Sequence, residues 1–125
     1  MKKIRLILLV LTFAGFVKVS AQNTPVLKFE KTTIDYGKVK KGSDGNRTFV
    51  FTNIGDAPII ISDVKSSCGC TIPKKPLQPI MPGEKGEIKV HYNTNIGGPF
   101  QKNIRIFSNA KRNIVEVHIK GIVEK

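Results

Sequence analysis

The chain has 125 residues and a formal charge of +12 at pH 7, with 21 Lys and Arg against 9 Asp and Glu. This length holds one small domain with a single core and excludes a second domain of ordinary size. The positive charge favours anionic partners, namely membrane surfaces, acidic glycans, nucleic acids or acidic proteins. The basic residues are scattered rather than clustered, so a solvated surface that keeps the protein soluble is the simpler explanation.

Residues 1–21 have the pattern of a secretory signal peptide. A cationic start precedes an apolar run from Leu6 to Val17, and small residues lead up to Ala21. Cleavage after Ala21 leaves a domain of residues 22–125 and, because four basic residues are removed, lowers the formal charge from +12 to +8. The alternative is a retained membrane anchor. The apolar run is shorter than the ~18–20 residues that span a bilayer, which argues against an anchor, and Lys18 is unusual beside a cleavage site.

These features predict an exported protein, located in the periplasm or outside the cell. We expect no stable membrane insertion after signal cleavage. Export also argues against nucleic acid as a partner.

The mature sequence predicts strands and no helices, because short runs of β-branched and aromatic residues alternate with Gly, Pro and Asn. About seven such strands in one small domain indicate two packed antiparallel sheets. We therefore predict an immunoglobulin-like β-sandwich over residues 22–125, with a small closed barrel as the alternative. The predicted strands are Val26–Glu30, Thr33–Val39, Arg47–Asn53, Ile59–Val64, Glu87–Asn93, Lys102–Ser108 and Ile114–Lys120.

Alternation within these strands predicts their inward faces. Three consecutive isoleucines, 59–61, predict a strand that is shielded on both faces. The four prolines between positions 72 and 83 exclude both a helix and a central strand there, because proline lacks the ladder donor. The side chains expected to point inward are Phe49, Phe51, Ile88, Val90, Tyr92, Val115, Val117 and Ile119.

Both cysteines lie one residue apart, within Ser67-Cys68-Gly69-Cys70-Thr71. Exported cysteines usually form disulfides, and within the chain these two can pair only with each other. In an extended strand their Cα atoms are roughly 6.5–7 Å apart, near the outer limit for a disulfide. Bonding therefore needs a tight turn, which Gly69 is best able to provide. In the chain-entropy model, a disulfide that closes a loop of ~3 residues stabilises the folded protein by only about 1.6 kcal/mol, which is little for a disulfide with a structural role.

Three interpretations of Cys68 and Cys70 remain open. The thiols can be reversibly oxidised, or they can bind a soft ion such as Cu(I), to which two thiolates are well suited. They can also be small apolar packing residues at a strand end, which is the interpretation we favour. Lys65, Lys74 and Lys75 are the cations close enough in sequence to favour a thiolate. We expect no cofactor, with Cu(I) as the alternative.

His91 and His118 are further candidate metal ligands, but each alternates with inward apolar residues and is expected to face solvent. In an immunoglobulin-like order their strands lie in different sheets, so joint ligation with the cysteines is not expected. No Ser, His and acid form a triad motif, and no glycine-rich loop precedes a helix. We therefore predict no enzymatic activity and no catalytic residue.

Three separated motifs resemble a bacterial family of exported proteins that is known only as domain-of-unknown-function family 1573. The stretch Ile34–Val39 fits the usual lead-in of that family. The resemblance implies an immunoglobulin-like sandwich, related in shape to hydin-like and sperm-protein-like domains, and it implies no activity. The motifs that carry it are Phe49–Ile61, Ser67–Thr71 and Ile80–Ile88.

The predicted function is a non-enzymatic binding or scaffolding module at the cell envelope. Its partner would be an unknown envelope protein or an anionic surface component, and strand addition at an open sheet edge is the mode we consider. The alternative is a thiol protein that carries Cu(I) or exchanges disulfides through Cys68 and Cys70.

Overall fold

The computed structural model describes residues 23–125, which form eight strands and no helix. The predicted signal peptide, residues 1–21, lies outside the described residues. In the part of the chain that is described, no helix has the length and apolar character needed to cross a membrane. The strands are β1 (Leu27–Phe29), β2 (Thr33–Lys40), β3 (Asn46–Asn53), β4 (Ile61–Ser66), β5 (Thr71–Lys74), β6 (Lys85–Tyr92), β7 (Gly98–Ser108) and β8 (Ile114–Glu124).

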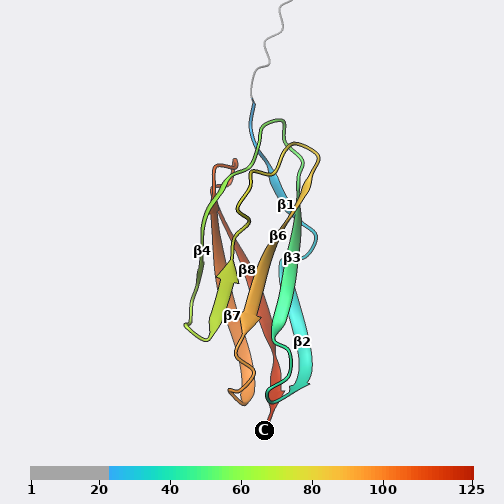
Figure 1. Ribbon diagram of the computed structural model, residues 1–125, viewed down its shortest axis with the longest axis vertical. Helices are drawn as coiled ribbons and strands as arrows, with labels where there is room; N and C mark the ends of the chain where they lie inside the picture. The colour runs from blue at the N-terminus through green and yellow to red at the C-terminus, as the bar shows by residue number, and fades with distance from the viewer. Residues whose placement is uncertain (1–22) are drawn as a thin grey trace, which may run out of the picture.

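The strands form two four-stranded sheets that run along the long axis of the molecule (Figure 1). Sheet A has the order β1-β3-β6-β5, and sheet B has the order β2-β8-β7-β4. Neighbouring strands are antiparallel except β2 and β8, which are parallel. This is the order of an immunoglobulin-like sandwich in which the first strand is divided between the sheets. Because the sheets have separate end strands, the alternative of a closed barrel is wrong.

Alternating side chains of both sheets fill the space between them. In β6 the burial alternates without a break, with Ile88, Val90 and Tyr92 inside and charged residues outside. The inward residues predicted from alternation are buried, apart from Val115, which is half-buried. Sheet B contributes Ile104, Ile106, Val117, Ile119 and Val123 to the same core. The predicted sandwich is thus confirmed.

Two details of the prediction are wrong. The isoleucines at 59–61 are not shielded on both faces, since Ile60 is 52% exposed while Ile59 and Ile61 are buried. They lead into β4 of sheet B, and in a sandwich of two sheets each sheet has one face open to solvent, so Ile60 points outward between two buried isoleucines. The eighth strand, β5, was not predicted because it is short and contains Pro73, which is compatible with an end strand.

Candidate functional site

The Cys-Gly-Cys segment connects the end strand β4 of sheet B to the end strand β5 of sheet A. The chain turns at this point, and the amide of Thr71 donates to the carbonyl oxygen of Cys68, 3.2 Å away. The turn reduces the Cα–Cα separation of Cys68 and Cys70 to 5.3 Å, and their sulfur atoms are joined in a disulfide. The segment therefore forms a small ring at the corner where the chain changes sheets.

Hydrogen bonds from both sheets hold this corner. On the sheet B side, the amide of Ser67 donates to the Asn103 carbonyl, and the Ser67 hydroxyl accepts from the Asn103 amide. On the sheet A side, the Asn93 amide donates to the carbonyl oxygen of Cys70. Cys70 packs against the core, and Thr71 is buried. The ring is therefore fixed in place by backbone contacts rather than left free in a loop.

Gly69 does not have the special role that the sequence suggested. Its φ angle lies outside the left-handed region, in contrast to that of Gly37, Gly42, Gly83 and Gly98. A Cβ atom built at position 69 would meet nothing within 4 Å. The tight turn expected at Gly69 is present, but it uses no left-handed conformation at this residue, which is exposed to solvent.

Two of the three lysines expected to favour a thiolate make other contacts. Lys65 lies 3.9 Å from Asp63, and the ammonium group of Lys75 donates to the carbonyl oxygen of Ser62. Lys74 lies on the outer face of β5, exposed to solvent. Two polar side chains contact the pair: the Ser66 hydroxyl accepts from the Cys68 amide, and the Thr71 hydroxyl lies 3.8 Å from the Cys70 sulfur.

The two histidines lie in different sheets, His91 on β6 and His118 on β8, as predicted. His91 contacts Asn46 through Nδ1 at 3.0 Å, and His118 contacts Asn103 through Nδ1 at 2.8 Å. Among residues 23–125, no group of three or more His, Cys, Asp or Glu side chains is arranged to hold a metal ion. Neither histidine therefore joins the cysteine pair.

The other two motifs meet at the opposite end of the sandwich. The side chain of Asn53, fully buried at the end of β3, accepts from the Gly55 amide and donates to the carbonyl oxygens of Ala57 and Ile80. Ile59 and Ile80 also exchange two backbone hydrogen bonds. These motifs join the β3–β4 and β5–β6 loops, so their role is structural.

The lead-in stretch contributes a second buried polar contact. The Tyr36 hydroxyl donates to the carbonyl oxygen of Gly45 at 2.8 Å, and the Arg47 guanidinium lies 4.1 Å from the centre of the Tyr36 ring. Burial raises the pKa of Tyr36 to about 12, although the Arg47 charge acts in the opposite direction. This contact closes the end of the sandwich where β2 and β3 are joined.

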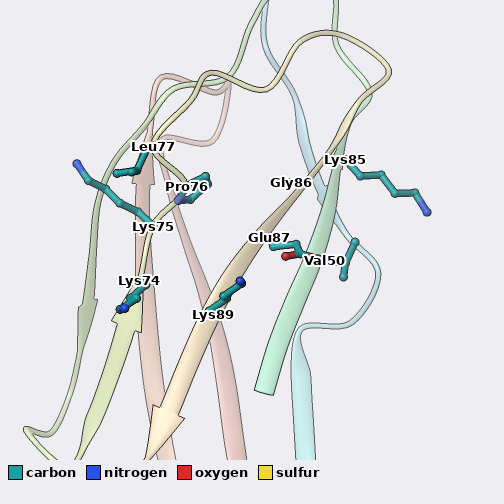
Figure 2. A pocket seen from close by; sticks show the side chains of 9 residues that line it. All are labelled: Val50, Lys74, Lys75, Pro76, Leu77, Lys85, Gly86, Glu87 and Lys89. Carbon is teal, nitrogen blue, oxygen red and sulfur yellow. The ribbon is translucent and has the colours of Figure 1, made fainter. Parts of the chain in front are cut away.

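A groove on the outer face of sheet A is the second candidate site. It lies between the exposed faces of β3 and β6 and the segment that follows β5, and its volume is about 560 Å³ (Figure 2). Lys74, Lys75, Pro76 and Leu77 form one side, and Val50 lies across the groove from them. A second hollow of about 350 Å³ shares Lys74 and Lys89 with the first. Together they make one elongated groove, called the lysine groove below.

Positive charge dominates the lysine groove. Four lysines line it, and among its described lining residues only Glu87 is acidic. Lys85 points away from the groove (Figure 2) and pairs with Glu30 at 3.1 Å. Lys74 and Lys89 are register partners on β5 and β6, so they lie side by side. Within residues 23–125 neither ammonium group makes an ion pair or a hydrogen bond.

Sequence reasoning missed this groove. The alternation in residues 87–93 predicts that Lys89 lies on the outer face of its strand. The pairing of Lys74 with Lys89 could not be predicted, because β5 lies in a proline-rich segment that does not have the pattern of a strand.

Comparison with known proteins identifies the family of this chain. Residues 27–123 match the family described as protein of unknown function DUF1573, and the chain belongs to that family. A search of curated protein sequences found no match. Membership accounts for the motifs and the sandwich and assigns no activity.

Solved structures support the fold alone, because their sequence identities are low. A protein of unknown function from Porphyromonas gingivalis W83 matches with a TM-score of 0.73 and 16% identity, over 83% of this chain and 49% of that one. This chain therefore spans about half the length of the Porphyromonas protein. A PapD-like domain of human CEP192 matches with a TM-score of 0.66 and 7% identity, over 90% and 96% of the two chains.

A chaperone–tip adhesion subunit pre-assembly complex from Acinetobacter baumannii matches with a TM-score of 0.55 and 12% identity. The match covers 80% of this chain and 57% of that one. The neighbours thus include bacterial and human sandwiches of the PapD-like kind.

Proposed function

We propose that this protein is a non-enzymatic binding module that is exported to the bacterial cell envelope and recognises an anionic partner protein through the lysine groove. The carrying observation is the side-by-side placement of Lys74 and Lys89, whose charges have no partner among the described residues. The amino-terminal pattern of a cationic start and a short apolar run supports export.

A groove fits the structure better than strand addition at a sheet edge. In β5, Pro73 has no amide hydrogen, and the amide of Thr71 is used by Cys68. The β1 strand has 3 residues, and both β2 and β4 carry irregularities in their pairing. Each edge is thus short, irregular or poor in donors, as is usual where sheets avoid edge-to-edge pairing. The outer face of sheet A, in contrast to these sheet edges, offers the lysine groove to a partner.

A photo-crosslinking experiment in intact bacteria tests this proposal. A photoreactive residue replaces Ile72, which is 57% exposed beside the groove, or, as a control, the exposed Gln101 on sheet B. We expect a discrete protein adduct from position 72 that disappears when Lys74→Gln and Lys89→Gln are added. The same adduct from position 101, or one indifferent to the lysine substitutions, contradicts the proposal.

The disulfide supports a second candidate function, thiol–disulfide exchange. A thiolate of a partner dithiol protein would attack one sulfur of the Cys68–Cys70 bond and release the other as a thiolate. The partner's second thiolate would then displace the first sulfur, which leaves the partner oxidised and this protein with two thiols. Equilibration with dithiothreitol buffers, followed by mass spectrometry, measures this reaction. Failure to gain two hydrogens under any buffer in which the fold survives contradicts exchange.

Copper binding belongs to the same candidate, because only the reduced pair has thiolate ligands. Titration of the reduced protein with Cu(I) against a competing chelator is the measurement. Binding that is absent, or unchanged in a Cys68→Ser and Cys70→Ser variant, contradicts it.

A further inference from the structure

The charge pattern of the two outer sheet faces differs. On sheet B, Arg105 lies across from Lys65 on one side and from Glu116 on the other, and Lys65 lies 3.9 Å from Asp63, so both of these cations have an acidic neighbour. On sheet A, Lys74 lies across from Lys89. Like charges placed directly opposite each other in a sheet are destabilising, whereas opposite charges stabilise. The lysine pair therefore lowers the stability of the free protein, and an anionic group bound between the two would remove that cost.

Apolar surface lies beside this pair. Leu77 is 88% exposed and lines the groove opposite Val50, and Ile72 is 57% exposed at the other end. The binding surface thus has cations at its centre and an apolar position on each side of them. Ile72 and Lys74 are outward positions two residues apart on β5, whereas Leu77 lies in the segment that follows β5 and Val50 lies on β3.

This pattern discriminates between anionic partners. A lipid bilayer presents a broad surface, whereas the lysines line a groove that Pro76 and Leu77 border on one side. An acidic glycan satisfies the lysines but brings hydroxyl groups that Val50, Leu77 and Ile72 cannot hydrogen-bond through their side chains. An extended polypeptide places successive side chains about 3.3 Å apart along its axis and can present a carboxylate and apolar groups in turn.

We infer that the lysine groove binds an extended acidic segment of a partner protein, with one carboxylate between Lys74 and Lys89 and an apolar side chain against Leu77 and Val50. This inference rests on the proposed function and names the chemistry of the partner. The two ammonium groups form charge-assisted hydrogen bonds with one carboxylate, and Leu77 becomes covered.

Fluorescence anisotropy with the mature chain, residues 22–125, and three labelled peptides tests the inference. Each peptide has about eight residues, enough to follow β6, which also has 8. One alternates Glu with Leu, one alternates Gln with Leu, and one alternates Glu with Ser. We expect the Glu–Leu peptide to bind at least about tenfold more tightly than either of the others, a difference of about 1.4 kcal/mol.

Protein variants localise the binding. Lys74→Gln with Lys89→Gln should weaken binding of the Glu–Leu peptide at least about tenfold. Lys38→Gln with Lys41→Gln removes the same charge from exposed positions on β2 and the following turn, and should leave binding unchanged. Leu77→Ser should weaken binding of Glu–Leu and leave that of Glu–Ser unchanged. Equal binding of Glu–Leu and Gln–Leu, or equal loss in both lysine variants, overturns the inference.

Two further probes separate this inference from the proposed function. If vesicles containing phosphatidylglycerol, or an anionic polysaccharide, bind through Lys74 and Lys89 while no peptide does, the inference is wrong, and the proposed partner protein stands only if position 72 gives the lysine-dependent adduct. If no probe binds and position 72 gives no crosslinked adduct, both are wrong.

Discussion

The Nδ2 atom of Asn53 donates a hydrogen bond to the carbonyl oxygen of Ile80, 2.9 Å away and 27 residues along the chain. This bond ties the end of β3 to the loop that precedes β6. The backbone of Asn53 adds two more links, since its amide donates to Glu84 and its carbonyl accepts from Gly83. Two of the three motifs that resemble the family are therefore halves of one buried contact, which explains why they occur together.

Replacing Asn53 by Ala should lower the free energy of unfolding by about 3 kcal/mol, because the part-buried Gly55 amide and Ala57 carbonyl lose their hydrogen-bond partner and the buried Ile80 carbonyl keeps only its bond from the Ile59 amide. Asn113→Ala is the matched control, since its exposed side chain makes none of the hydrogen bonds found within residues 23–125, and it should change stability by less than about 0.5 kcal/mol. Urea unfolding followed by circular dichroism is suitable, since the chain has no Trp. Equal effects of the two substitutions contradict a structural role for Asn53.

The cost of the lysine pair can be measured without a ligand. Lys74→Glu turns the pair with Lys89 into one of opposite charge and should stabilise the protein by about 0.5 kcal/mol at low salt. The gain should shrink in 1 M NaCl, where the screening length is about 3 Å. Lys38→Glu makes the same change of charge at a position that faces Ile122 in the register of β2 and β8. If both variants respond alike, the effect comes from net charge and not from the pair.

The sandwich could be predicted from sequence because its core strands alternate. Phe49, Phe51, Ile88 and Val90 are each inward at every second position, and a sheet with one buried face leaves no other register. Such patterns report burial and carry no information on which strands are neighbours. The parallel pairing of β2 with β8 and the separate strand β5 were therefore missed.

The candidate sites were predictable to a smaller degree. Covalent geometry required a tight turn only if Cys68 and Cys70 were bonded, and the sequence left that pairing open, so the separation of 5.3 Å between their Cα atoms was not predictable. The lysine groove depends on a contact between strands, so neither Lys74 nor Lys89 is informative alone. Ile60 is exposed because it points outward between two buried isoleucines, and a run of three isoleucines does not show which of them faces solvent.

The stability of the protein should depend on the ionisation of Tyr36. Its pKa is raised from an unfolded value of about 10 to about 12, so the folded state holds the phenolic proton more tightly. The resulting stability is fully present below pH 10 and is lost as the pH rises through 12. Tyr36→Phe removes this dependence together with the hydrogen bond to Gly45.

Unfolding free energies at pH 8, 10 and 11 for the wild type and Tyr36→Phe provide the comparison. The variant should be less stable by about 1 kcal/mol at pH 8, and the difference should shrink as the pH rises. Burial also raises the pKa of Tyr92, but that residue is present in both proteins. Parallel pH curves for the two proteins are the result that contradicts this prediction.

Substitution by Ala should destabilise the protein at Gly45 and leave its stability unchanged at Gly69. A Cβ atom at position 45 would lie against the backbone carbonyl of Tyr92, and the carbonyl oxygen of Gly45 itself accepts from both the Tyr92 amide and the Tyr36 hydroxyl. Neither backbone can move without breaking these bonds. Gly45→Ala should therefore lower the free energy of unfolding by about 3 kcal/mol.

Gly69→Ala should be neutral to within about 0.5 kcal/mol, because its φ is not left-handed and its surroundings are empty. Urea unfolding of both variants, each with the Cys68–Cys70 pair oxidised, gives the comparison. A large loss at position 69 would show that the turn needs glycine after all, as its place between the cysteines first suggested.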